Sequence, residues 1–381
     1  MDLNRHKIAV VITTINKPVV LESIARNCAK YNRLDTIEVI VVGDRKTPED
    51  VSDYISFVSD TFGLMVEYMD INSQKEYLVD FPDLEKIIPY DSDNRRNIGH
   101  LIAYERKADV IVALDDDNFP LDESDFLAPF DALGSVIDQK MIKVDHGWYN
   151  ICNELESEFN HEFYPRGFPY NMRGKASSLK NIAGDGTQRL MVKAGLWLGD
   201  PDIDAATRLV HPIDVRKFSG NQMYLYPGTR CPFNTQNTGF HRELMPSMYY
   251  VCMGKIIGGQ KIDRYGDIWL SYFLQKVMSA MRDVVGFGFP LVNHSRNQHD
   301  LLEDLGQEYP GMLLTNKLVE FLNNIELDGQ CYVTYTRCLA EEMLRSVQND
   351  GLFTESEKKY IDEVANNILI WLDAVIRVTN R

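Results

Sequence analysis

Three consecutive aspartates, Asp115, Asp116 and Asp117, have the residue types and spacing that point most directly to chemistry in this chain. Adjacent carboxylates repel one another, so a cluster of three indicates a bound cation. Oxygen ligands of this kind suit Mg²⁺ or Mn²⁺. The alternative is a polar loop that merely follows a strand, because short motifs often occur by chance.

The apolar run directly before the aspartates is the element that must position them. Residues 110–114 read VIVAL, and a short apolar run rich in β-branched residues is typical of a buried, parallel strand. The carboxylates would then emerge at the C-terminal edge of a sheet, where open α/β sheets bind their ligands.

The rest of the N-terminal third predicts an alternation of strands and helices. Strands are predicted at residues 7–15, 37–42 and 64–69, and helices at residues 20–28 and 97–106. Such alternation indicates right-handed βαβ units and a parallel sheet. The first strand is not followed by GxGxxG, which argues against a dinucleotide dehydrogenase.

Composition excludes some broad classes of function. The formal net charge of −16 over 381 residues disfavours extended nucleic-acid binding, which needs clustered Lys and Arg. The six cysteines form no CxxC pair, which favours free thiols in a reducing compartment. The N-terminal segment lacks a signal-peptide cleavage pattern, and no apolar run approaches the roughly 20 residues that span a bilayer. We therefore expect a cytoplasmic protein without a transmembrane segment.

The amino-acid composition of the chain changes after the aspartates. Residues 150–294 are rich in Gly, Pro, Asn and aromatic residues, which predicts a loop-rich region. After about residue 310 the chain is predicted to be helical, with amphipathic runs at residues 313–325, 336–348 and 354–378. These helices either offer an interface for a homo-oligomer or bury their apolar faces on their own core.

Several longer segments resemble one protein family in their order along the chain. They are residues 115–119 (DDDNF), 164–173 (YPRGFPYNMR), 195–198 (GLWL), 201–212 (PDIDAATRLVHP), 237–244 (NTGFHREL), 263–269 (DRYGDIW) and 290–295 (PLVNHS). Together they resemble the plant reversibly glycosylated polypeptides, which are the UDP-arabinopyranose mutases. The resemblance spans roughly residues 110 to 300, with a looser match from residue 7.

The resemblance implies a GT-A glycosyltransferase fold. That fold is α/β, a Rossmann-like and mostly parallel sheet flanked by helices, here with a C-terminal helical extension. We expect a nucleotide-sugar-binding and catalytic domain at residues 1–305 and the extension at residues 306–381. The segment RRNIG at residues 95–99, before a helix and the strand that leads to the aspartates, is similar to the same fold and assigns Arg96 to the donor site.

The resemblance also implies roles for charged residues. The metal, Mn²⁺ or Mg²⁺, would be held by Asp115, Asp117 and His294 against the diphosphate of a UDP-sugar. Arg166 stands where the family carries its reversibly glycosylated arginine, and Arg173 matches a second required arginine. Both are of a residue type that clamps diphosphates well, and a surface arginine in a turn is the alternative.

Acidic residues further along the chain would contact the sugar or its acceptor. Asp267 would be the general base that deprotonates an acceptor hydroxyl, or an acid favoured in the first turn of a helix. Asp202 and Asp204 would bind sugar hydroxyls, although a turn rich in Asp and Pro is a sufficient structural reason for both.

Polar residues at the ends of the first two strands would bind the nucleoside. Thr13 and Thr14 end the first strand, and Asp44 follows the second. They occupy the base and ribose positions of GT-A enzymes, and Asp116 completes the donor-binding aspartates.

Three activities remain open at this point. The leading interpretation is a glycosyltransferase-type enzyme that transfers the sugar of a UDP-sugar to an acceptor or to itself. The alternative is a mutase that interconverts pyranose and furanose forms, and a less favoured one is a non-catalytic scaffold subunit. Departures from the family lie on the expected acceptor side, where Gly266 replaces the first Asp of the motif GRYDDMW. The sugar, the acceptor and the stereochemical outcome are left undetermined.

Overall fold

The apolar runs near the N-terminus form the parallel strands predicted from them. The computed structural model describes residues 6–158, 161–175, 178–297 and 300–381, so the first five residues of the N-terminal segment discussed above lie outside it. The strands are β1 (Ile8–Thr13), β2 (Ile37–Val42), β3 (Val66–Met69) and β4 (Val110–Asp115). They pair in parallel in the order β3-β2-β1-β4, which confirms the predicted alternation.

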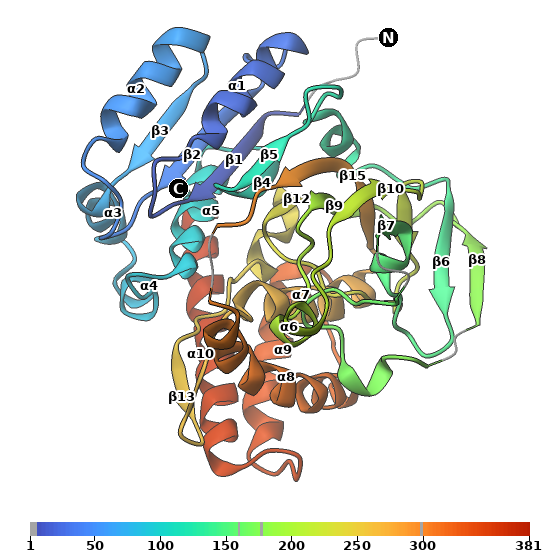
Figure 1. The fold of residues 1–381 in the computed structure, drawn as a ribbon. Coiled ribbons are helices and arrows are strands. Elements are labelled where there is room, and N and C mark those ends of the chain that lie inside the picture. Colours follow the sequence, from blue (N-terminus) through green and yellow to red (C-terminus); the bar gives the residue numbers. More distant parts are fainter. Residues whose placement is uncertain (1–5, 159–160, 176–177, 298–299) are drawn as a thin grey trace.

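Helices cover this parallel part of the sheet. The helices of this part are α1 (Val20–Lys30), α2 (Val51–Phe62), α3 (Ile71–Leu78), α4 (Pro82–Ile87), the short η1 (Asp93–Arg95) and α5 (Arg96–Glu105). Helices α1 and α2 pack together, whereas α5 packs on β1 and β2 (Figure 1). Because β2 and β4 lie on opposite sides of β1, the strand order reverses at β1, and such a switch point is where open α/β sheets bind ligands.

The second half of the sheet mixes strand directions. β12 (Asn237–His241) runs antiparallel to both β4 and β9 (Leu190–Gly199), and β15 (Val284–His294) runs parallel to β9. These strands extend the same sheet beyond β4, so the region predicted to be loop-rich also supplies central strands. Shorter strands complete the sheets: β5 (Asn118–Pro120), β6 (Lys140–Val144), β7 (Leu155–Ser157), β8 (Leu179–Ala183), β10 (Val215–Phe218), β11 (Met223–Leu225), β13 (Lys255–Ile257) and β14 (Gln260–Ile262).

A close approach of α5 to the sheet fixes the start of that helix. A Cβ atom at Gly99 would lie 2.5 Å from Cγ1 of Val11 and 2.9 Å from Cγ2 of Val42. Only glycine therefore lets α5 lie this close to β1 and β2. The helix begins at Arg96, which is consequently held directly above the ends of the strands.

The C-terminal helices pack on the domain that precedes them. They are α8 (Leu301–Asn324), α9 (Tyr332–Val347) and α10 (Glu355–Thr379). α10 packs on α9, α4 and α5, and its N-cap Thr354 accepts a hydrogen bond from the Glu357 N–H in a capping box. The helical C-terminus is thus confirmed, but α8 begins before Pro310 and runs across the boundary expected between residues 305 and 306. In the described residues, no helix is long and apolar enough to cross a membrane.

The remaining helical segments connect the strands of the second half. They are η2 (Ala128–Ala132), η3 (Ile151–Glu154), η4 (Tyr170–Met172), α6 (Ala205–Val210), η5 (Arg242–Ser247) and α7 (Gly266–Met281). α7 matters most for the site, because its first turn faces the ends of the central strands.

Candidate functional site

A cavity of about 570 Å³ opens at the C-terminal ends of β1 and β4. Thr13 and Asp115 are paired across these two strands, so the end of one lies beside the start of the acidic triplet. Most of the residues predicted for the site line this cavity: Thr13, Thr14, Asp44, Arg96, Asp115, Asp116, Asp117, Arg166, Asp202, Asp267 and His294. The fold therefore brings together residues from eight separate segments of the sequence.

The three aspartates have three different partners. Asp115 forms an ion pair with Arg96, which also donates to Thr13 Oγ1 at 2.9 Å. Asp116 accepts a hydrogen bond of 2.6 Å from Thr14 Oγ1. Asp117 lies 3.5 Å from Nε2 of His294 (Oδ2 to Nε2). The triplet is therefore divided between an arginine, a hydroxyl and an imidazole.

Burial and mutual repulsion act on the charges of the triplet. Burial raises the pKa of Asp115 to about 6, although the neighbouring Arg96 guanidinium opposes the shift. Burial also raises the pKa of Asp116 above its usual range. For Asp117 burial acts in the same direction, but hydrogen bonding and the charge of His294 outweigh it and lower the pKa. The site thus concentrates negative charge that a cation would relieve.

The imidazole of His294 is oriented by a backbone carbonyl. Its Nδ1 lies 2.6 Å from the carbonyl oxygen of Asp200, and since a carbonyl only accepts, Nδ1 carries the proton of this hydrogen bond. The other ring nitrogen, Nε2, is then the one that faces Asp117. Within the described parts of the chain, however, no group of three or more His, Cys, Asp or Glu side chains is arranged to hold a metal ion.

Arg166 is buried between two carboxylates. Its Nε and Nη2 donate to the two oxygens of Asp202 at 2.8 and 3.1 Å, and its Nη groups lie 3.3 and 3.4 Å from the oxygens of Asp267. Burial alone would lower the pKa of Arg166, but these two carboxylates raise it well above its usual value. Conversely, burial raises the pKa of Asp202, yet Arg166 outweighs it and lowers the pKa. Arg166 is therefore a fixed cation.

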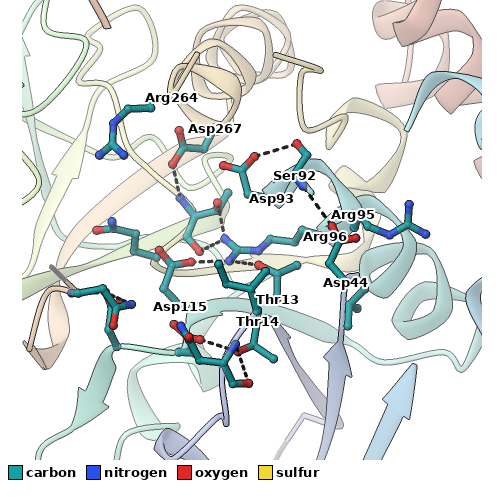
Figure 2. A pocket seen from close by; sticks show the side chains of 18 of the residues that line it. Thr13, Thr14, Asp44, Ser92, Asp93, Arg95, Arg96, Asp115, Arg264 and Asp267 are labelled. Carbon is teal, nitrogen blue, oxygen red and sulfur yellow. Dashed lines mark hydrogen bonds and ion pairs between the residues drawn. The ribbon is translucent and has the colours of Figure 1, made fainter. Parts of the chain in front are cut away.

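Asp267 is an acidic residue in the first turn of a helix, one of the two alternatives that the sequence left open. It lies in the first turn of α7 and accepts hydrogen bonds from its own helix at Ile268 N (2.9 Å) and from Thr235 N (3.3 Å). It also lines the cavity. Figure 2 shows it beside Arg264, across the cavity from Asp44.

Asp44 lies in the wall at the opposite end. Its carboxylate accepts hydrogen bonds from the backbone of Arg45 (2.8 Å) and of Ser92 (3.1 Å), which joins the loop after β2 to the loop before α5. In the same wall, the Arg95 guanidinium stacks on the ring of Tyr90 at 4.2 Å. This end of the cavity is consequently lined by polar side chains that have fixed partners.

Arg173 and Asp204 do not line the cavity. The Cζ atom of Arg173 lies 3.9 Å from the centre of the Tyr170 ring, and its Nη2 donates to Asp204 Oδ2 at 2.7 Å. Asp204 is fully buried and caps α6 by accepting from Thr207 N. The structural reason given above for Asp204 therefore accounts for it, and the pair holds the loop that carries Arg166 rather than facing a ligand.

Several cavity residues were not predicted. They are Ser92, Asp93, Arg208, Thr235, Tyr250, Arg264, Arg296 and Asn297. Asp93 lies two residues before Arg95 in a segment that had been singled out, and Arg296 lies two residues after His294, so both had a signal close by. The others are placed by long-range contacts that local sequence does not encode.

Comparison with known proteins identifies the family. The family model for reversibly glycosylated polypeptides matches residues 3–379. UDP-arabinopyranose mutase 2 of Arabidopsis thaliana is 27% identical over 219 residues, which cover 55% of this chain and 53% of that protein. UDP-arabinopyranose mutase 3 of the same plant is 29% identical over 213 residues, with 55% and 53% coverage. The chain thus spans about half the length of the curated relatives it matches.

Solved structures give more distant similarities. Glucosyl-3-phosphoglycerate synthase from Mycobacterium tuberculosis, in complex with Mn²⁺ and uridine-diphosphate-glucose, has a TM-score of 0.39 at 11% identity and covers 81% of this chain and 78% of its own. The mannosyltransferase PcManGT from Pyrobaculum calidifontis, in complex with GDP-Man and Mn²⁺, has a TM-score of 0.37 at 11% identity, with 100% and 76% coverage. On the strength of the family model, which matches nearly the whole length, this chain belongs to the reversibly glycosylated polypeptide family.

Proposed function

We propose that this protein is a metal-dependent enzyme of the glycosyltransferase type that acts on a UDP-sugar in the cavity at the ends of β1 and β4. One observation carries the proposal: the aspartates that end β4 lie at the switch point of the sheet, beside Thr13 and His294 and in one cavity with Arg166. A nucleotide sugar needs a place for its nucleoside, its diphosphate and its sugar. A different part of the cavity lining would contact each of these three groups.

The side chains are of the types that hold a divalent ion, and they would have to move together to bind it, because the described residues form no preassembled group of three metal ligands. Asp115 and Asp117 would supply carboxylate oxygens and His294 would supply Nε2, because its Nδ1 is engaged by a backbone carbonyl as in many metal-bound histidines. Asp115 would then give up part of its pairing with Arg96. A bound Mn²⁺ or Mg²⁺ would neutralise charge that develops on the leaving diphosphate.

The residues of the chain would orient the two parts of the substrate. Asp44 and the Tyr90–Arg95 stack would hold the nucleoside, while Arg96 stays close to the diphosphate through its contact with Asp115. The Arg166 guanidinium fixes Asp202 and Asp267 in the part of the cavity wall that would face the sugar. This arrangement supports cleavage of the bond between the sugar and the diphosphate.

A mutase activity is the second candidate, and the names of the curated relatives favour it. The two activities differ only in the group that receives the sugar. Incubation with UDP-arabinopyranose and Mn²⁺, followed by NMR of the nucleotide sugar, separates them. Appearance of the furanose form supports the mutase, and free UDP together with a glycosylated acceptor or protein supports the transferase. If the pyranose remains unchanged and no UDP is released, this sugar is not the substrate.

A further inference from the structure

Asp93 is a cavity carboxylate that the site described so far does not use. It is the first residue of η1, and it lines the wall of the cavity. Figure 2 shows it beside Asp267, with Ser92 as its neighbour in the chain. Its carboxylate therefore faces the end of the cavity assigned to the sugar and its acceptor.

The neighbouring carboxylates at this end are already occupied. Asp202 and Asp267 are both paired with Arg166, and Asp267 also accepts from two backbone N–H groups. In contrast, Asp93 makes no ion pair within the part of the chain that the structure describes. Its acceptor capacity is met only by Tyr250 Oη at 2.5 Å and by Ser92 Oγ at 3.3 Å. Asp93 is thus the carboxylate here that is free to take a proton.

The contact between Tyr250 and Asp93 is built by the surrounding residues. Tyr250 is buried, and Asn97 holds its backbone by accepting from its N–H and donating to its carbonyl, both at 2.9 Å. A Cβ atom at Gly266 would collide with the Tyr250 ring and would lie 2.6 Å from the carbonyl oxygen of Val251. Gly266 replaces the first Asp of the family motif, so its missing side chain makes the room in which Tyr250 reaches Asp93.

We propose that Asp93 is the catalytic base that takes the proton of the attacking hydroxyl, with Asp267 as a positioning residue. This proposal rests on the proposed function. The O–H bond breaks towards Asp93 while the hydroxyl oxygen forms a bond to the anomeric carbon, and the bond between sugar and diphosphate breaks with its electrons passing to UDP. The hydroxyl belongs to an acceptor, which leaves with the sugar, or to the sugar itself. In the second case UDP attacks the anomeric carbon again, the bond from that carbon to the original ring oxygen breaks, and this oxygen takes the proton back from Asp93.

The electrostatics of the wall are consistent with this role. Burial in the surrounding protein raises the pKa of Asp93 above its usual range, and the charges of Asp267 and Asp263 act in the same direction. The hydrogen bond from Tyr250 and the charge of Arg96 oppose the shift. A carboxylate with a raised pKa is a stronger base than an ordinary one.

The test compares Asp93→Asn with the wild type, using UDP-arabinopyranose and Mn²⁺ as the probe. Turnover, followed as UDP release and by NMR of the sugar, should fall at least about 100-fold. The Kd of the probe should stay within about threefold of the wild-type value, because the proton transfer that the variant loses takes place after binding. The matched control is Asp83→Asn, which removes an exposed carboxylate of α4 paired with Lys86, and we expect wild-type turnover.

A second variant separates loss of the base from damage to the fold. Asp93→Ala should be inactive and should regain turnover when formate is added, because formate supplies the missing carboxylate. Turnover of Asp93→Asn within about threefold of wild type would overturn the role of Asp93 and leave the proposed function intact. A wild type that neither binds nor converts the probe would overturn both proposals. NMR of the product tells whether the hydroxyl came from an acceptor or from the sugar.

Discussion

Arg166 shows how a single residue organises the sugar end of the cavity. It is the shared partner of Asp202 and Asp267, which come from segments more than 60 residues apart in the sequence. Two buried carboxylates this close would repel each other strongly without a cation between them. The residue that the family resemblance singled out therefore has a structural task here, whatever its part in the reaction.

Replacing Arg166 with Met should destabilise the protein by about 3–5 kcal/mol, because it leaves two buried carboxylates uncompensated. Chemical denaturation at pH 7 measures the change in the free energy of unfolding. The matched control is Arg337→Met, which breaks an exposed ion pair with Asp373 and should change stability by less than about 1 kcal/mol.

The pH dependence of this effect has a defined sign. The folded-state pKa of Asp202 is lowered, so its stabilisation is present above the unfolded pKa of about 3.9 and is lost as the pH falls through the folded value. In Arg166→Met the carboxylates lack the cation that lowers this pKa. The difference in the free energy of unfolding between the wild type and the variant should therefore shrink as the pH falls towards 4. A stability difference between the two proteins that does not change with pH would contradict the electrostatic explanation.

His100 should make stability depend on pH in a different window. Burial, followed by the charge of Arg96, lowers the pKa of His100 to about 3, and neither ring nitrogen has a hydrogen-bond partner in the described structure. For a base with a lowered folded pKa, the unfolded chain binds more protons between pH 3 and 6.5, so stability falls as the pH falls below about 6.5. Between pH 7.5 and 5.5 the loss should be about 1.4 kcal/mol.

The variant His100→Phe isolates this contribution. The centroids of the His100 and Phe240 rings are 5.3 Å apart, and the rings pack edge to face. A phenyl ring at position 100 would keep this packing but has no nitrogen that can be protonated. Urea unfolding at the two pH values should show a smaller loss in the variant than in the wild type. Equal losses would mean that His100 is not the source of the dependence.

At the scale of elements, local patterns were predictable and long-range pairing was not. Strands β1, β2 and β4 and helices α1, α5 and α10 follow apolar periodicity that is visible in the sequence. β12 has the sequence NTGFH, in which Asn and Gly are poor strand formers, and its pairing with β4 and β9 holds it as a strand. Tyr250 was not predicted for the same reason, since its contact with Asp93 joins segments 157 residues apart.

The close packing of α5 leads to a prediction about the site. Gly99→Ala should push α5 away from Val11 and Val42, lower stability by about 1–3 kcal/mol and weaken UDP binding, because Arg96 begins this helix. Thermal unfolding and calorimetric titration with UDP and Mn²⁺ measure both effects. Gly306→Ala in α8 is the control, because an added methyl group meets no atom there and should stabilise the helix by about 0.5–1 kcal/mol.

At the scale of the whole molecule, the C-terminal helices are part of one core. Trp371 is fully buried and donates from Nε1 to the carbonyl of Met245 at 2.9 Å, and Tyr360 Oη donates to the carbonyl of Cys252 at 2.9 Å. The apolar face of α10 is thus covered by its own chain, which was one of the two outcomes left open by the sequence. On α8, Leu302, Tyr309 and Leu313 remain exposed.

Trp371→Ala should therefore destabilise the entire protein and not only its C-terminal end. We expect a loss of about 3–5 kcal/mol in a single cooperative transition, because the cavity opens inside the shared core. Unfolding is followed by circular dichroism and by tryptophan fluorescence. Two separated transitions would show that the helices form an independent unit.

The central claim is that the aspartates that end β4 bind a UDP-sugar through a divalent metal. The most direct measurement is the thermal shift caused by UDP-arabinopyranose with and without Mn²⁺, in the wild type and in a variant with Asp115→Ala and Asp117→Ala. A ligand whose free concentration is about 100 times its Kd stabilises the native state by about 2.7 kcal/mol. We therefore expect a clear rise in Tm for the wild type with Mn²⁺. The variant should show no rise. An equal rise without Mn²⁺, or an unchanged rise in the variant, would contradict the claim.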